Sequence, residues 1–417
     1  MHRSRNSGFS LVELMVAAVI GIIGSIIIFQ VFSVFENQKR NTTSGGDAET
    51  NLSIATSAFE QAAQQAGYGM NFASHLGCTV HQWKDPAGPI TPPTTVMPPG
   101  VYNTMVLAPI LLERNPDSTL KSITFVRTRG DSSYAVTQLR VPFITSFEED
   151  IKPANIYGFH QGDVLLFAEK KDTSDPKKIN HITCAVTDVR TLELPPPAEN
   201  PPGNTIPQRI VHTRGDYVKP ETGTVTYYTQ YNKAGGLGTL QTSPTPILVP
   251  DAETRFKFSG SAFIMNIGQV IKGSDWSLHR TQFSLSNGQL LEGDPAGGKA
   301  YPLVDGVVFM DAQLGMAATP KRTASETSVI YYKEMPKDAD PDVMPRVAQE
   351  DWFKLRTVRI AMVVRTSQFD KNYTSPSSYS FWDSSLTTTY VVPSSDRNYR
   401  HKVVEMVIPL RNFYWRP

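Results

Sequence analysis

The strongest pattern along the chain is an apolar run close to its N-terminus. No residue from Leu14 to Phe35 is charged. As a helix these residues would measure about 33 Å, enough to cross the roughly 30 Å hydrocarbon core of a bilayer. Arg3 and Arg5 precede the run, and basic residues favour the cytoplasmic side of a membrane. The pattern predicts a membrane-spanning helix, with the rest of the chain outside the cytoplasm.

A second helical pattern follows the apolar run. Residues 41–47 are polar and include Gly45 and Gly46, which favour a break or bend in a helix. Apolar residues then recur at helical spacing until the glycines at 67 and 69: Leu52, Ala55, Phe59, Ala62 and Ala66. We expect one long, interrupted helix. Residues 9–35 would form its membrane-spanning or filament-core half, and residues 36–68 would pack on a soluble domain.

Strand patterns dominate the remainder of the chain. Short runs rich in β-formers, bounded by turn residues, lie at Ser122–Arg127, Ala135–Val141, Asp163–Ala168, Val225–Tyr231 and Gly306–Leu314. Alternating apolar positions at residues 358–364 and 404–410 predict two half-buried strands. Proline-rich stretches at Asp85–Gly100 and Leu194–Pro207 predict surface loops. The expected fold class is α+β: a long N-terminal helix on a large, mostly antiparallel β domain at residues 69–417.

Composition and charge narrow the classes of function. The 417 residues are 40% hydrophobic, which is enough for a large core and places the chain outside the disordered class. Forty basic residues face 39 acidic ones, for a formal net charge of +1. Because a nucleic-acid-binding chain shows a basic surplus or stripe, we expect no nucleic-acid partner.

One acidic residue interrupts the apolar end of the predicted membrane helix. Glu13 lies between Val12 and Leu14, five residues after Gly8, and an ionisable group there is costly and usually functional. The segment from Gly8 through Phe9 to Met15 resembles the class III signal of type IV pilins and type II secretion pseudopilins. The alternative for Glu13 is a residue that merely snorkels to the membrane interface.

This resemblance implies a processing step and an assembly role. Prepilin peptidase would remove residues 1–8 by cutting between Gly8 and Phe9, and Phe9 would then be N-methylated. The apolar helix would first anchor the chain in the inner membrane and later join a bundle of sister helices. Glu13 would pair there with the N-terminal amine of a neighbouring subunit.

Further motifs narrow the resemblance to minor pilins of the PilW type, which are related to the J-type pseudopilin. They are Ala66-Gly67-Tyr68, Leu303-Val304-Asp305-Gly306-Val307, the Arg-flanked strand at residues 356–365 and Pro409-Leu410-Arg411-Asn412. Residues from about 80 to 270 carry little family signal. The resemblance implies a subunit that primes a type IV pilus, with adhesion and twitching motility as its context. It would lie first in the inner membrane with a periplasmic domain, then at the pilus tip on the cell surface.

The same resemblance implies the partners, and it leaves two other functions open. The implied partners are other minor pilins, the major pilin, a tip adhesin, prepilin peptidase and the inner-membrane assembly platform. One alternative is a type II secretion pseudopilin of the J type. The other is a singly anchored surface adhesin or binding module that does not polymerise.

The two cysteines, Cys78 and Cys184, allow three interpretations. Export to an oxidising compartment favours a disulfide between them. Free thiols are the second interpretation. The third is a zinc site, because His75, His81 and His181 lie three residues from a cysteine and zinc prefers tetrahedral Cys and His ligands.

Patterns for other chemistry are weak. Asp338, Asp340 and Asp342 alternate as calcium ligands can, but the glycine and distal glutamate of an EF-hand loop are missing, so a solvated acidic loop is expected. The glycines at residues 235–238 predict a turn. The sequence contains neither a nucleophile elbow nor His-Glu-x-x-His. We therefore expect a structural protein, with no enzymatic activity, no cofactor and no metal.

Overall fold

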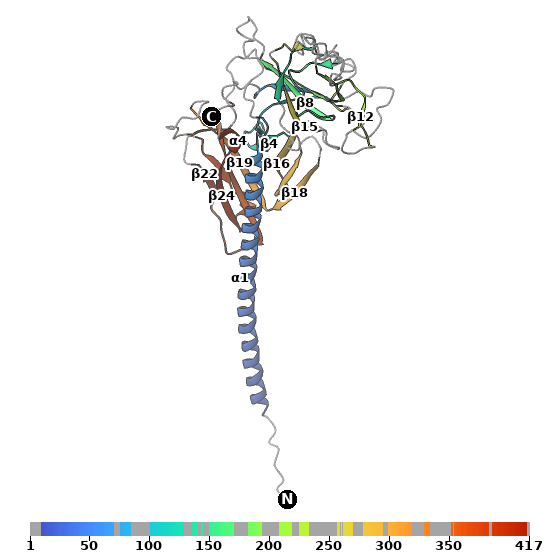
Figure 1. Cartoon of the computed structure of the whole chain (residues 1–417). Helices are drawn as coiled ribbons and strands as arrows, with labels where there is room; N and C mark the ends of the chain where they lie inside the picture. The colour runs from blue at the N-terminus through green and yellow to red at the C-terminus, as the bar shows by residue number, and fades with distance from the viewer. Residues whose placement is uncertain are drawn as a thin grey trace, which may run out of the picture.

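The computed structural model describes residues 10–70, 76–84, 101–128, 136–140, 143–144, 150–170, 182–193, 208–218, 225–232, 257–258, 260, 262–269, 278–294, 299–318, 329–333, 352, 354–382 and 386–414. A long N-terminal helix projects from a set of β-sheets that surround its far end (Figure 1). The expected α+β class is confirmed.

The helix α1 spans Leu11–Gln65, 55 residues, and is about 80 Å long at 1.5 Å per residue. The expected interruption at Gly45 and Gly46 was wrong, because both residues are helical. Each glycine costs the helix roughly 1 kcal/mol relative to alanine. The flanking residues Ser44 and Ala48 are buried against the β domain, and this packing holds the helix straight through the glycine pair.

Two sheets lie against the far half of α1, which contacts β21, β24, β18 and β4. One is four-stranded in the order β20-β19-β21-β24, and the other is five-stranded in the order β18-β17-β16-β4-β3. Their strands are β3 (Ile110–Arg114), β4 (Leu120–Arg127), β16 (His279–Ser286), β17 (Gln289–Asp294), β18 (Lys299–Asp305), β19 (Val307–Ala317), β20 (Val329–Tyr332), β21 (Leu355–Phe369) and β24 (Tyr399–Pro409). A short helix α4 (Arg411–Tyr414) follows β24.

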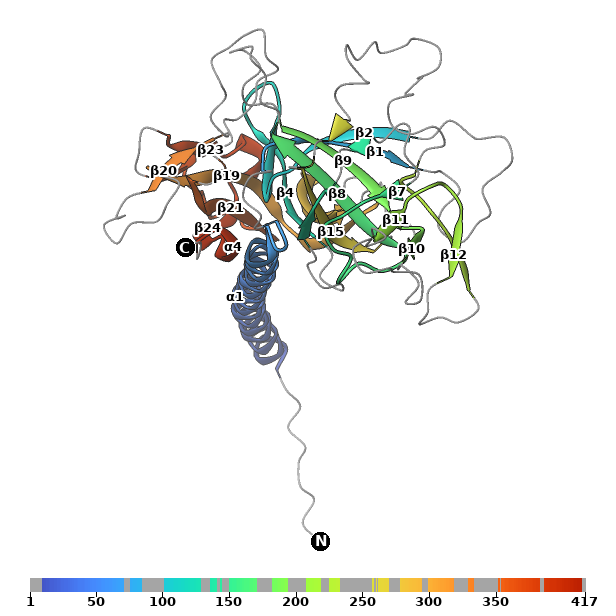
Figure 2. The ribbon, with the colours of Figure 1, turned by 45° about the horizontal axis from the view of Figure 1, so that its top comes forward.

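A six-stranded sheet in the order β2-β1-β9-β8-β15-β5 forms a second lobe, beyond the end of α1 in Figure 1 and to one side of it in Figure 2. Its strands are β1 (Thr79–Lys84), β2 (Val101–Val106), β5 (Val136–Gln138), β8 (Asp163–Lys170), β9 (Ile182–Asp188) and β15 (Phe263–Gln269). Among the described strands, β1 and β9 form the one parallel pair.

Short sheets complete the structure. They are β10 (Thr191–Glu193) with β11 (Arg209–Val211) and β7 (Asp150–Ile151), β12 (Asp216–Val218) with β13 (Thr226–Tyr228), β14 (Lys257–Phe258) with β6 (Phe143–Ile144), and β22 (Ser378–Phe381) with β23 (Thr388–Val391). A 3-10 turn at Ser394–Asp396 precedes β24.

Most predicted strands are present, with one error of burial. Residues 122–127, 163–168 and 306–314 lie largely in β4, β8 and β19, whereas β5 and β13 are only three residues each. The prediction that residues 358–364 form a half-buried strand was wrong, because β21 is buried on both faces. One face of β21 packs in the main core with α1. Ala361 and Val363, on the other face, pack against Phe381 and Trp382. Both proline-rich stretches lie outside the described residues.

A disulfide joins Cys78, just before β1, to Cys184 in β9, 106 residues later in the sequence. Both cysteines are almost fully buried, and Cys184 pairs in register with Val80 of β1. The bond therefore reinforces the parallel pair of the second lobe. The disulfide interpretation replaces both free thiols and a zinc site, since a bridged sulfur is no longer the thiolate that zinc binds.

Replacing both cysteines by alanine is expected to lower the free energy of unfolding by about 2–4 kcal/mol, because the unfolded chain loses a long loop constraint. Denaturant titration of the two proteins in the same detergent measures the difference. An unchanged transition midpoint would contradict a stabilising role for the disulfide.

Candidate functional site: the N-terminal helix

The first half of α1 exposes nearly all of its apolar surface. Every large hydrophobic side chain from Leu11 to Phe35 is between 50% and 77% exposed. Figure 1 shows this half of the helix standing clear of the β domain. An 18-residue window of α1 is apolar enough to cross a membrane, and none of the window is buried within the protein. A surface of this size needs lipid or other helices to cover it.

Glu13 lies in the first turn of α1, where it takes part in the start of the helix. The Glu13 backbone N–H donates to Ser10 Oγ (3.1 Å), and the Ser10 N–H donates to Glu13 Oε2 (3.3 Å). This reciprocal pair is a capping box, which satisfies two backbone donors that a helix start leaves free. Sequence reasoning located Glu13 but missed this second use of its carboxylate. Gly8 and Phe9 lie outside the described residues.

The second half of α1 is buried along one face, formed by Ser44, Ala48, Ala55, Phe59 and Ala63; we call this the packing face. The small residues let the sheets approach the helix backbone closely. Phe59 fills the remaining space, with its ring centroid 4.3 Å from that of Phe283 and 6.4 Å from that of Phe125. Sequence periodicity predicted Phe59 and Ala55 on this face.

Polar contacts hold the helix at the point where it enters the β domain. Ser44 and Ser367 share a hydrogen bond between their hydroxyls (3.2 Å), and the Gln368 N–H donates to Ser44 Oγ (3.3 Å). Asn41 Nδ2 donates to Asp370 Oδ2 at 3.3 Å. Sequence reasoning missed these contacts, since it treated residues 41–47 as a polar break.

The far end of α1 is held by backbone and amide contacts. Asn412 Nδ2 donates to the carbonyls of Gln64 (3.2 Å) and Ala66 (2.9 Å), two of the carbonyls that a helix end leaves without a partner. Gly67, at φ +71°, turns the chain so that its N–H donates to the Val126 carbonyl at 2.8 Å. Other side chains adopt this left-handed conformation only with strain.

A third contact lies midway along the packed half. Asn51 Nδ2 donates to the Asp305 carbonyl at 3.1 Å. The next residue, Gly306, has φ +81°, and a Cβ there would lie 2.7 Å from the Arg365 carbonyl oxygen. The Arg365 N–H donates to the Gly306 carbonyl at 2.7 Å, which aligns β21 with the start of β19. Three motifs that carried the sequence resemblance therefore meet along α1: Ala66-Gly67-Tyr68, Asp305-Gly306 and Asn412.

Two of the sequence-predicted metal patterns fall partly or wholly outside the described residues. Five of the candidate ligands lie outside the described residues: His75, His181, Asp338, Asp340 and Asp342. For His81, only the position of its backbone in β1 is described. Within the described ranges, no group of three or more His, Cys, Asp or Glu side chains is placed to hold a metal ion. The glycine cluster at residues 235–238 is also outside them.

Two family models match the chain. The model described as Type IV Pilus-assembly protein W matches residues 269–412, and the model described as the prokaryotic N-terminal methylation motif matches residues 3–29. The first match contains β16 to β24, including β18, β21 and β24, three of the four strands that contact α1. The second contains Glu13 and most of the apolar run.

Among solved structures, a type IV-like pilin from Thermus thermophilus is similar to part of the chain. The identity is 12%, the match covers 33% of this chain and 66% of that protein, and the TM-score is 0.17. This likeness is too low to carry an argument. No curated protein matches the chain.

Proposed function

We propose that this chain, of which residues 269–412 match the PilW family model and residues 3–29 match the N-terminal methylation motif, acts as a minor pilin that helps to prime a type IV pilus and lies at its tip. The observation that carries the proposal is the division of α1. One half exposes a largely apolar surface, and the other half is fixed to the β domain by its packing face and by Asn41, Asn51 and Asn412.

The division gives a mechanism for assembly. An apolar helix leaves lipid without a large penalty only if its surface is covered again, and burial contributes roughly 25 cal/mol per Å² of apolar area. A bundle of sister helices covers it. Because the second half of α1 is fixed, any movement of the exposed half is passed on to the β domain as a rigid body.

Glu13 would determine how neighbouring helices align in the bundle. A carboxylate surrounded by apolar helices needs a cation, and the family resemblance supplies the N-terminal amine of a neighbouring subunit, exposed once Phe9 becomes the first residue. Prepilin peptidase and the inner-membrane assembly platform are the partners for processing and extraction. Other minor pilins, the major pilin and a tip adhesin are the partners within the filament.

The second lobe supports a position at the tip. The six-stranded sheet lies beyond the end of α1 (Figure 1), on the side away from the apolar half. It would obstruct a further subunit stacked above it, whereas subunits below can still pack against the exposed half of α1. The lobe precedes the part of the chain that matches the PilW family model.

Mass spectrometry of the chain from sheared filaments and from membranes tests the proposal. We expect a chain that begins at a methylated Phe9 in both fractions, at low abundance relative to the major subunit in the filaments. Gly8→Ala is the control and should accumulate with residues 1–8 attached. A chain that keeps its leader and never enters the filament fraction would overturn the proposal.

A further inference from the structure

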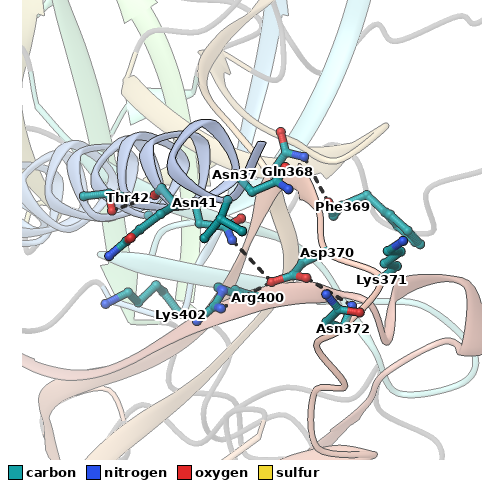
Figure 3. A pocket seen from close by; sticks show the side chains of 13 residues that line it. Asn37, Asn41, Thr42, Gln368, Phe369, Asp370, Lys371, Asn372, Arg400 and Lys402 are labelled. Atoms are coloured by element: carbon teal, nitrogen blue, oxygen red, sulfur yellow. Dashed lines mark hydrogen bonds and ion pairs between the residues drawn. The ribbon is translucent and has the colours of Figure 1, made fainter. Parts of the chain in front are cut away.

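A groove of about 800 Å³ lies where α1 enters the β domain (Figure 3). We call it the basal groove. One wall is α1, from Val34 to Gly45, and the other is the segment 368–372 with two residues of β24, Arg400 and Lys402. The hydrogen bond from Asn41 to Asp370 joins the two walls.

The position of the groove along α1 places it next to a bilayer surface. Phe35 is the last residue of the apolar run. Asn37 and Asn41 follow it by two and six residues, which is a rise of roughly 3–9 Å along the helix axis. The polar layer on each side of a bilayer core is about 5–8 Å thick. With the apolar run in the hydrocarbon core, the part of the helical wall nearest Phe35, around Asn37, therefore lies at the level of the lipid headgroups, and Asn41 lies just beyond it.

The charge of the basal groove suits an anionic headgroup. Its lining contains three cations, Lys371, Arg400 and Lys402, and one acid, Asp370, for a net charge of +2. Asp370 is already engaged by Arg400 Nη2 (3.4 Å), by the Asn41 amide and by the Asn372 N–H. Lys402 is 3.8 Å from Glu49, with both side chains at least half exposed. Exposed pairs of this kind are weak, so they compete little with a bound phosphate.

Aromatic side chains accompany the cations. Phe369 is 51% exposed, and its ring meets the Tyr399 ring edge-on at 5.6 Å between centroids. The Arg400 guanidinium lies over the Tyr373 ring at 4.7 Å. Tyrosine side chains are enriched at both membrane–water interfaces, and interfacial Tyr, Lys and Arg side chains anchor protein segments there. Val34 and Phe369 give the groove an apolar edge that acyl chains can contact.

We infer that the basal groove binds the headgroup phosphate of anionic phospholipids, so that the base of the β domain docks on the surface of the membrane that α1 crosses. The cations Lys371 and Lys402 attract the phosphate, and Phe369 enters the interface beside it. This inference goes beyond filament assembly and requires only that α1 spans a bilayer. Docking fixes the angle between the β domain and the membrane while the chain is still in lipid.

Fluorescence of the full chain in nanodiscs tests the inference. An environment-sensitive dye on Thr374→Cys, an exposed position beside the groove, reports docking. We expect a blue shift in nanodiscs that contain phosphatidylglycerol, absent in phosphatidylcholine alone and reversed by high salt. The double variant Lys371→Gln/Lys402→Gln should lower the docked-to-undocked ratio about 25-fold, since each basic residue near an anionic surface contributes about fivefold.

Lys299→Gln is the matched control, because Lys299 is an exposed lysine on β18 at the end of that strand away from Asp305 and the membrane. It should leave the shift unchanged, and equal unfolding midpoints for all variants show that they fold. The inference is overturned if the blue shift is the same in nanodiscs with and without phosphatidylglycerol, or if Lys299→Gln reduces it as much as the double variant does. It is also overturned if the blue shift appears only when pilin subunits assemble.

Discussion

Replacing Glu13 by glutamine is expected to reduce incorporation of the chain into filaments by roughly a hundredfold or more, while membrane insertion stays normal. The variant leaves the neighbouring subunit's amine buried without a counter-charge, and breaking such a pair costs about 3–5 kcal/mol. Glutamine can still complete the capping box with Ser10. The substitution therefore removes the charge and keeps the helix start.

Ser10→Ala is the matched control, because it removes the hydroxyl that accepts the Glu13 N–H and keeps the carboxylate. Loss of such a cap costs about 1 kcal/mol of helix stability, so incorporation should fall far less. Immunoblots of sheared filaments and of membranes measure both variants. If Ser10→Ala were as defective as Glu13→Gln, the main role of Glu13 would be to start its own helix.

Replacing Phe59 by alanine is expected to lower the free energy of unfolding by about 3–5 kcal/mol, the usual cost of removing a fully buried aromatic ring. Phe59 is 0% exposed and contacts the rings of Phe125 and Phe283. The cavity would lie between α1 and the five-stranded sheet. Because small residues form the rest of the packing face, its neighbours have little bulk with which to fill the space.

Denaturant unfolding in detergent, followed by tryptophan fluorescence, measures this loss. Ile54→Ala is the control on the same helix, since Ile54 is 43% exposed and surface substitutions usually change stability by no more than about 0.5 kcal/mol. Equal losses in the two variants would mean that α1 is not held by its packing face.

Helices and strands were predicted best from the sequence where one hydrophobic periodicity extends over many residues. The apolar run and the helical spacing from Leu52 to Ala66 were enough to predict the two halves of α1 and to place Ala55 and Phe59 on its packing face. The alternation in residues 404–410 was enough to predict β24, in which Val407 is exposed and Ile408 is buried. Local patterns of this kind depend only on the geometry of one element.

Tertiary context decided the features that sequence reasoning missed. The residues at 41–47 have the composition of a helix break, yet contacts from Ser44 to β21 keep them helical. The second buried face of β21 depends on Phe381 and Trp382, which follow β21 along the chain. The hydrophobic pattern within β21 does not indicate that another segment packs against its second face.

The buried ion pair between Arg114 and Asp311 is a further example. The two side chains are 2.8 Å apart, both only 5% exposed, and join β3 to β19 across 197 residues of sequence. Arg114 also donates to the Ala312 and Lys333 carbonyls, and Thr388 donates to the second oxygen of Asp311. Neither residue stands out in the sequence, because the pair exists only once two sheets meet.

The contact between Asn412 and the end of α1 has a consequence for biosynthesis. Asn412 follows Gln64 by 348 residues, and a ribosome needs roughly 20–70 s to add that many. Over that interval the helix has emerged while β21 and β24, two of the strands that pack against it, are incomplete. We therefore expect the nascent chain to need a chaperone at its packing face until translation ends.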